Sequence, residues 1–182
     1  THSGEVEAVK PGELIYFDVA VHLSDVGYDG SVYFGVLVDA CTRLMQVYTM
    51  KSRTEALVVF QKFRQFFKSH SDYKIKKLRT DQAAELMSAE FEAYLREHSI
   101  WHQKSNPYLH QQNGVAESNI KKVRHVANTI MEHGQVPIRF WPEAVKTAAH
   151  LCNLNVHSSL GENEEVPYVA FFGKQPNYDE LR

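Results

Sequence analysis

Apolar and polar positions along the first third of the chain predict three consecutive strands. The three segments are rich in β-branched and aromatic residues and are separated by turn residues. They span Glu13–Val21, Val32–Asp39 and Leu44–Met50. Apolar and polar residues do not alternate cleanly in the first segment, which is typical of a strand covered on both faces. We therefore expect an antiparallel meander whose first strand is buried on both sides.

Beyond Met50 the apolar spacing changes to that of helices and strands in turn. The pattern predicts a helix capped by Ser52 or Thr54 and running to about Phe67, a strand over 73–79, a helix over 88–97, a strand over 100–103 and a long helix to about Glu132. In chain order this is βββ-α-β-α-β-α. That order is typical of an α/β protein with a ribonuclease-H-like fold, a mixed five-stranded sheet with helices on both faces.

The remaining segments define the expected domain organisation. A polar loop is expected over Lys104–Asn113, and Asn113-Gly114 is a turn signal immediately before the long helix. A further helix is expected from Phe140 to about Leu154. We expect a polar tail over 1–10, a single core domain over 11–156, and a linker, short helix and tail over 157–182.

Composition and charge narrow the class of protein. The 182 residues are 43% hydrophobic and 23% charged, which is an ordinary globular balance. The chain starts with Thr1 rather than Met, so we interpret it as a piece excised from a longer protein. It has no signal-peptide pattern and no apolar segment approaching 18 residues, so we expect an intracellular protein without a membrane span. Cys41 and Cys152 are expected to be buried, reduced thiols. His98 and His102 are four residues apart, but their segment is predicted to be a strand, so we expect structural or surface roles for them rather than metal binding.

A formal net charge of −2 excludes a nucleic-acid footprint spread over the whole surface. Any contact with nucleic acid must therefore be local. Two basic clusters qualify: Lys74, Lys76, Lys77 and Arg79, and Lys121, Lys122, Arg124 and His125. We interpret the first cluster as the solvated edge of a sheet, because lysines commonly protect edge strands from pairing.

Three acidic residues are the candidates for chemistry. Asp18 interrupts an apolar strand, where an ionised carboxylate is costly without a partner, and Asp81 ends a strand. Glu117 lies on the first turns of the long helix and shares one face with Lys121 and Arg124. Taken alone, that face also fits an exposed helix with an ion pair worth roughly a few tenths of a kcal/mol.

The same residues resemble the catalytic core of retroviral-type integrases. Asp81 and Glu117 are separated by 35 residues, and the segment Gln111–Glu117 resembles the Ty1/copia class of retrotransposon integrases. Two later segments, Phe140–Asn153 and Pro167–Pro176, resemble the same class. Asp39, which also ends an apolar segment, is a rival third acid, but the resemblance gives its position a structural role and favours Asp18.

The resemblance implies a polynucleotidyl transferase of the DD35E type. Asp18, Asp81 and Glu117 would be both the catalytic residues and the ligands of two Mg²⁺ ions, for which Mn²⁺ can substitute. Two such ions about 3.5–4 Å apart activate a nucleophile, stabilise the reacting phosphorus and neutralise a leaving oxygen. The DNA-binding residues implied are Gln112, Asn113, Lys121 and Arg124.

The resemblance also implies partners and a location. They are double-stranded DNA from the element ends and the target, a homo-oligomer of at least two copies, a host tethering protein, and action in the nucleus after a stage in a cytoplasmic particle. The chain departs from the family pattern at Gln82-Ala83-Ala84, where glycines are usual, so the turn after Asp81 must differ or be strained. Two alternatives remain, a nuclease and a DNA-binding or assembly module without activity.

Overall fold

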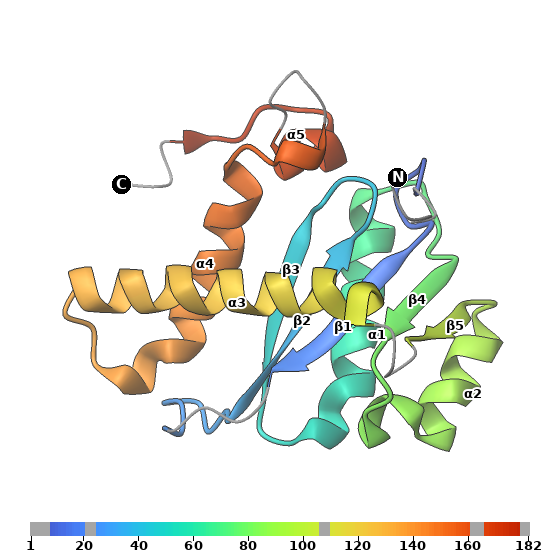
Figure 1. Ribbon diagram of the computed structural model, residues 1–182, viewed down its shortest axis with the longest axis horizontal. Helices are drawn as coiled ribbons and strands as arrows, with labels where there is room; N and C mark the ends of the chain where they lie inside the picture. Colours follow the sequence, from blue (N-terminus) through green and yellow to red (C-terminus); the bar gives the residue numbers. More distant parts are fainter. Residues whose placement is uncertain (1–7, 21–24, 106–109, 161–165, 179–182) are drawn as a thin grey trace.

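The computed structural model describes residues 8–20, 25–105, 110–160 and 166–178, and for residues 110–117 it describes the backbone alone. The described residues form a five-stranded sheet with helices on both faces (Figure 1). The strands are β1 (Ile15–Ala20), β2 (Tyr33–Asp39), β3 (Met45–Met50), β4 (Lys77–Thr80) and β5 (Trp101–Lys104). The helices are α1 (Ala56–His70), α2 (Ala89–Glu97), α3 (His110–His133), α4 (Trp141–Leu154) and α5 (Pro167–Phe172), and the 3-10 turns are η1 (Arg53–Glu55), η2 (Ala84–Met87), η3 (Ile138–Phe140) and η4 (Ser158–Leu160).

The strand order is β3-β2-β1-β4-β5, which makes β1 the central strand. β1 pairs antiparallel with β2, and β2 pairs antiparallel with β3. β1 and β4 are parallel, as are β4 and β5. The predicted meander, the mixed five-stranded sheet and the order βββ-α-β-α-β-α are therefore confirmed.

Two apolar layers explain why β1 lacks a clean alternation. Ile15 and Phe17 are fully buried against residues of α1 and α2 on one face of the sheet. Tyr16 and Ala20 are buried on the other face, against residues of α3 and α4. Figure 1 shows α3 crossing this second face. A strand with helices on both sides must be apolar at odd and even positions.

Local capping fixes where two helices begin. Ser52 accepts a hydrogen bond from the Thr54 amide, and Glu55 accepts one in return from the Ser52 amide at 3.1 Å. This capping box opens η1, so α1 itself begins only at Ala56. Ser88 caps α2 by accepting a hydrogen bond from the Phe91 amide at 3.2 Å.

Two expectations about local structure were wrong. α3 begins at His110, so Asn113-Gly114 lies inside a helix and the expected loop over Lys104–Asn113 is too long. A glycine inside a helix costs about 1 kcal/mol, which the burial of a long apolar stripe on the same helix can outweigh.

The first basic cluster is not on a sheet edge. β4 begins at Lys77 rather than at residue 73, and it lies between β1 and β5. Neighbouring strands in a sheet are chosen by long-range pairing, which a local run of lysines does not report.

Both cysteines are free thiols, as expected, but only one is fully buried. Cys152 is buried, whereas Cys41 is half-buried.

The C-terminal helix packs against α1. In α5, the Phe171 ring stacks on Phe66 of α1 with centroids 6.1 Å apart. In the part of the chain that the structure describes, no helix is both long enough and apolar enough to cross a membrane.

Candidate active site

Asp18 lies in the central strand, on the sheet face that α3 covers. Side chains alternate along a strand, so Asp18 shares the face of Tyr16 and Ala20, which belong to the core beneath α3 and α4. Its carboxylate is partly buried, and Oδ1 accepts a hydrogen bond from the Val19 amide at 2.8 Å. Asp18 thus lies within a packed layer but remains partly exposed to solvent.

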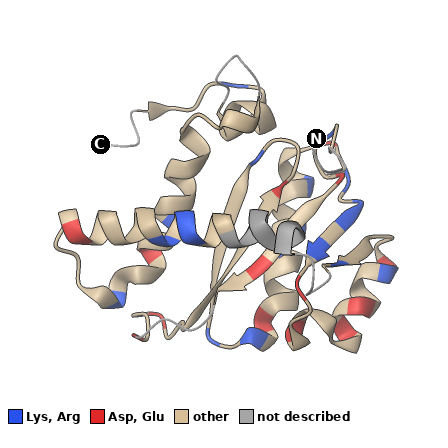
Figure 2. Cartoon of the chain, viewed as in Figure 1, with Lys and Arg blue, Asp and Glu red and all other residues tan. Residues whose placement is uncertain are grey.

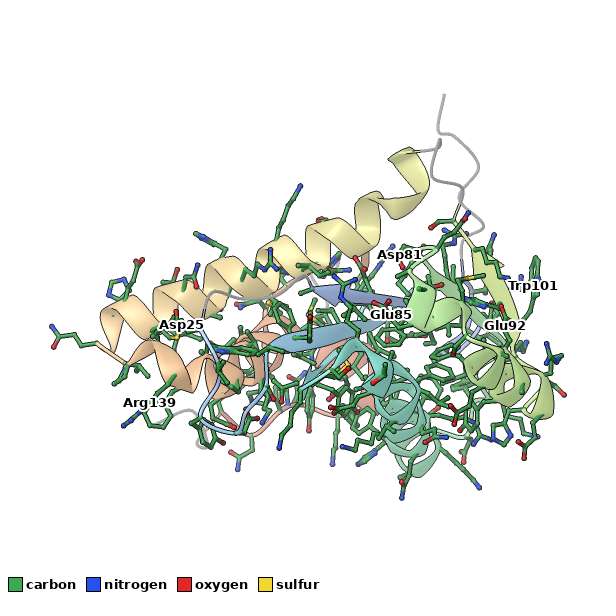
Figure 3. All side chains as sticks on the ribbon, turned by 90° about the horizontal axis from the view of Figure 1, so that it is seen from below. Asp25, Asp81, Glu85, Glu92, Trp101 and Arg139 are labelled. Carbon is green, nitrogen blue, oxygen red and sulfur yellow. The ribbon has the colours of Figure 1, made fainter. Side chains whose placement is uncertain are left out.

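Asp81 directly follows the neighbouring strand, β4. Tyr16 pairs with Arg79 in the parallel ladder, and the two aspartates each follow that pair by two residues. Continuing this register by two residues brings Asp81, just past the end of β4, level with Asp18 of β1, and adjacent strands lie about 4.8 Å apart. Figure 3 shows Asp81 at this end, on the side of the first turns of α3.

Hydrogen bonds between side chains and the backbone hold the segment around Asp81. The Ser105 hydroxyl donates to the Thr80 carbonyl at 2.8 Å, and the Thr80 hydroxyl lies 2.7 Å from the Asp81 carbonyl. Asp81 Oδ1 accepts a hydrogen bond from the Ala83 amide at 3.1 Å. This short turn leads into η2, and Ala83 has a φ of −61°. Ala83 and Ala84 are not among the described residues with positive φ. The turn therefore differs from one that needs glycine, and the two alanines adopt it without backbone strain.

A buried polar network behind Asp81 was not predicted. His102 of β5 is 2.8 Å from the Thr80 hydroxyl through Nε2 and 3.0 Å from Glu92 of α2 through Nδ1. Lys104 pairs with the same Glu92 carboxylate at 2.9 Å. Burial would raise the pKa of Glu92, but the hydrogen bonds from Lys104 and His102 outweigh it and hold that pKa below its usual value. The sequence signal for this network is His102, for which a structural or surface role is expected rather than metal binding.

The third candidate acid, Glu117, lies in α3. The backbone of α3 is helical from His110, so Glu117 is in its third turn. The side chains of Gln112, Asn113 and Glu117 lie outside the described residues, so how close Glu117 comes to the two aspartates stays a prediction.

The donor set fits a hard divalent cation. Aspartate and glutamate oxygens are the protein ligands that Mg²⁺ prefers. Among the side chains that the structure describes, which exclude Glu117, no three His, Cys, Asp or Glu residues are placed to hold a metal ion. That Asp18, Asp81 and a residue of α3 together hold a metal ion therefore stays a prediction.

Asp39 has the environment of a structural carboxylate. It is 0% exposed and accepts hydrogen bonds from the Gly12 amide at 2.8 Å, the Thr42 amide at 2.8 Å and the Thr42 hydroxyl at 2.7 Å. It pairs with Ile15, at the other end of β1 from Asp18. Burial raises the pKa of Asp39 in spite of these donors. A carboxylate this enclosed has no room for a cation, which favours Asp18.

The two basic candidates on α3 differ in their surroundings. Lys121 is exposed. Arg124 is half-buried, and its guanidinium carbon lies 5.8 Å from the centre of the Phe34 ring. Arg124 also lines a cavity of about 210 Å³ together with Asp25 and Trp141. Sharing a helix face did not give these two residues the same exposure, because Arg124 lies over the sheet.

The sheet order and the two helical layers define a ribonuclease-H-like fold, and solved integrases share it. The chain is similar to one in the simian T-cell lymphotropic virus intasome solved with the PP2A regulatory subunit B56 gamma (TM-score 0.71, 16% identity, 93% of this chain and 56% of that one). It is also similar to the HTLV-2 integrase catalytic core domain solved with magnesium in a trimeric form (TM-score 0.65, 19% identity, 88% and 97%). The catalytic core domain of BIV integrase is a third (TM-score 0.66, 16% identity, 89% and 95%).

Sequence comparison gives the family. The family model "Integrase core domain" matches residues 8–109, more than half of the chain, so the chain belongs to the integrase core domain family. It is 32% identical over 170 residues to the Retrovirus-related Pol polyprotein from transposon TNT 1-94 of Nicotiana tabacum, covering 93% of this chain and 13% of that protein. The corresponding polyprotein from transposon RE1 of Arabidopsis thaliana is 27% identical over 177 residues, 97% of this chain and 12% of that protein. The resemblance inferred from the sequence is confirmed, and the chain spans about an eighth of these relatives.

Proposed function

We propose that this core joins the 3′ ends of retrotransposon DNA to target DNA by a one-step phosphodiester transfer. One observation carries the proposal. Tyr16 pairs with Arg79 on the parallel strands β1 and β4, and Asp18 and Asp81 each lie two residues beyond that pair, on the face of the sheet that α3, the helix of Glu117, covers. A set of two aspartates and one glutamate is what a two-Mg²⁺ phosphoryl-transfer site uses.

Three carboxylates would hold the metal in this proposal. Asp18 on the central strand, Asp81 and Glu117 would together be the ligands of the two Mg²⁺ ions. When bound, the ions supply activation of the attacking oxygen and neutralisation of charge at the phosphorus. The Ala83 amide restricts Asp81 by binding Oδ1. A carboxylate held in this way loses less conformational entropy when it binds a cation.

The surface of α3 would hold the DNA. Lys121 is exposed one turn beyond Glu117, where its ammonium can reach phosphate oxygens. Gln112 and Asn113, at the start of α3, would touch the same strand. Arg124 is half-buried against the Phe34 ring, closer to the sheet than Lys121, and its positive charge would attract the phosphate backbone of the DNA.

The reaction itself sets the assembly. Insertion of both ends of an element into opposite target strands needs two active sites, so we propose a homo-oligomer of at least two copies. The trimeric HTLV-2 core and the intasome in complex with PP2A regulatory subunit B56 gamma are assemblies of similar folds. We also propose that the reaction takes place in the nucleus, where target DNA lies, with a host protein as tether.

An oligonucleotide assay tests this function. The purified chain is incubated with Mg²⁺ or Mn²⁺, a labelled duplex with a recessed 3′ end and an unlabelled target. A second reaction uses a branched DNA that mimics the joined product, because the reverse transfer needs a single site. Joined strands, or resolved branches with a new 3′–5′ bond, support the proposal. Cut DNA without any joined strand indicates a nuclease, and intact DNA in both reactions indicates a module without activity; either result overturns the proposal.

A further inference from the structure

Among the described residues, no helix covers part of the sheet face on the α3 side. The core beneath α3 and α4 takes its strand residues from β1, β2 and β3. On β4 and β5, Lys77 pairs with Trp101 and Arg79 pairs with Gln103, so these four side chains share that face beyond the core. Trp101 is 59% exposed. We call Lys77, Arg79, Trp101 and Gln103 the β4–β5 face.

Contacts within the β4–β5 face hold its cations against aromatic rings. Lys77 Nζ lies 5.3 Å from the centre of the Trp101 ring. The Arg79 guanidinium lies 5.4 Å from the centre of the Tyr16 ring and donates to Gln103 Oε1 from Nε at 3.3 Å and from Nη2 at 3.1 Å. Cation–π contacts of this kind limit the motion of long side chains. The face is therefore preorganised.

The surroundings of the face are mainly positive. A hollow of about 330 Å³ beside it is lined by Lys76, Lys77, Arg79, Trp101, Gln103, Glu13, Leu14 and Ala8. Among the described lining residues the carboxylate is that of Glu13, which is 3.4 Å from Lys76 Nζ and accepts hydrogen bonds from two backbone amides. Figure 2 shows Lys and Arg gathered on β4. This charge is complementary to a phosphate backbone.

The β4–β5 face leads directly to the candidate acids. Tyr16 and Arg79 are two residues before Asp18 and Asp81 on the same strands. With a rise of about 3.3 Å per residue, Lys77 lies about 13 Å along the strand from Asp81. Figure 3 shows Trp101 at the outer edge of the sheet, away from α3. A strand of DNA lying on this face would point at the acids.

We propose that the β4–β5 face binds an unpaired segment of a DNA strand, with a base stacked on Trp101 and phosphates against Lys77 and Arg79. An exposed aromatic ring beside cations is the combination by which proteins hold single strands. The inference rests on the proposed function, because it supplies the path by which a DNA strand reaches Asp18 and Asp81.

Tryptophan fluorescence tests the binding without any catalysis. The chain has two tryptophans, and Trp141 is 2% exposed whereas Trp101 is 59% exposed. A short single-stranded deoxyoligonucleotide is titrated in buffer with EDTA, so that no metal is bound. Stacking on Trp101 quenches its emission, and anisotropy of a labelled oligonucleotide gives the affinity. A blunt duplex of the same sequence has no unpaired base inside it and is expected to leave the emission unchanged.

Variants separate stacking from charge. Trp101→Ala should remove the quenching and weaken affinity about tenfold, while Trp101→Tyr should restore most of the affinity. Lys77→Ala should lower the slope of log affinity against log salt by about 0.7. The matched controls are Tyr178→Ala and Lys62→Ala, which change an exposed aromatic and an exposed cation elsewhere and should alter neither quantity.

Three results would overturn the inference: unchanged emission at saturating oligonucleotide, unchanged affinity in Trp101→Ala, or equal quenching by the blunt duplex. The outcome is separable from that of the joining assay. Quenching that persists in Asp81→Asn, which keeps the face intact, supports the surface even if no joining is seen. Joining without quenching leaves the proposed function in place and removes the β4–β5 face from it.

Discussion

The two ends of the central strand hold aspartates in opposite environments. Near its beginning, Ile15 pairs with Asp39, which is completely buried and has three hydrogen-bond donors around it. Near its end, Asp18 is partly buried and stands level with Asp81, which is also partly buried. The β2–β3 hairpin closes around the first carboxylate, whereas the second end of the strand lies beside the start of α3.

This difference separates a structural acid from a candidate catalytic one. Both carboxylate oxygens of Asp39 accept hydrogen bonds from protein donors, Oδ1 from the Gly12 amide and Oδ2 from the Thr42 amide. Asp18 and Asp81 each accept a backbone amide hydrogen bond through Oδ1, and both residues are partly exposed. A metal ion must be able to reach its ligand, so exposure is more informative here than the presence of an acid in a strand.

The largest expected effect is the loss of joining when a candidate ligand is neutralised. Asp18→Asn, Asp81→Asn and Glu117→Gln should each lower the rate of strand joining roughly a thousandfold or more, because an amide does not hold a divalent ion as a carboxylate does. Far-UV circular dichroism should remain that of the native protein. Asp72→Asn changes an exposed acid elsewhere and should keep full activity. Residual joining above a tenth in Asp81→Asn would contradict the assignment.

Asp39 should give the converse result, a loss of stability. Asp39→Ala leaves the amides of Gly12 and Thr42 and the Thr42 hydroxyl without an acceptor, which should lower the free energy of unfolding by about 2–4 kcal/mol. Urea denaturation measures it, with Asp72→Ala as the exposed control. Because burial raises the pKa of Asp39, its titration adds stability below the unfolded pKa and that gain is lost as pH rises through the folded pKa. A change below 1 kcal/mol would remove the distinction between the two ends.

Metal binding should stabilise the folded protein only through the site at Asp18 and Asp81, not through Asp39. Mg²⁺ at about a hundred times its dissociation constant should raise the free energy of unfolding by about 2.7 kcal/mol. The corresponding thermal shift should vanish in Asp81→Asn and persist in Asp39→Asn, compared at equal ionic strength with NaCl. The same shift in Asp81→Asn as in the unmodified chain would show that the metal binds elsewhere.

The smallest effect concerns the network behind Asp81. Glu92→Gln removes the partner of His102 and Lys104 and should cost roughly 0.5 kcal/mol at pH 7. Because the pKa of Glu92 is lowered in the folded state, its contribution is present above the ordinary value of 4.5 and is lost as pH falls through the folded pKa. Urea midpoints at pH 7 and pH 3 measure it. An equal effect of Glu92→Gln at both pH values would rule out this coupling.

Much of the fold was predictable because the pattern that specifies a strand or a helix lies in residues close together in the sequence. The burial of β1 on both faces was predictable because apolar residues occupy both odd and even positions of the strand. The start of α2 was predictable because Ser88 is a residue type that commonly caps helices, and it accepts a hydrogen bond from the Phe91 amide. The start of α3 was not predictable in the same way. Asn113-Gly114 favours a turn on its own, and only packing over the whole helix determines that it is helical.

By itself the sequence determined the order of the elements, the family and the three acids worth testing, because apolar periodicity and short motifs depend on residues close together in the chain. Only the tertiary structure decided that β4 is an interior strand, that Asp39 is enclosed while Asp18 stands level with Asp81, and that Trp101 remains exposed beside Lys77. These features depend on which strands pair and which faces the helices cover. Long-range packing sets both, and no local pattern records it.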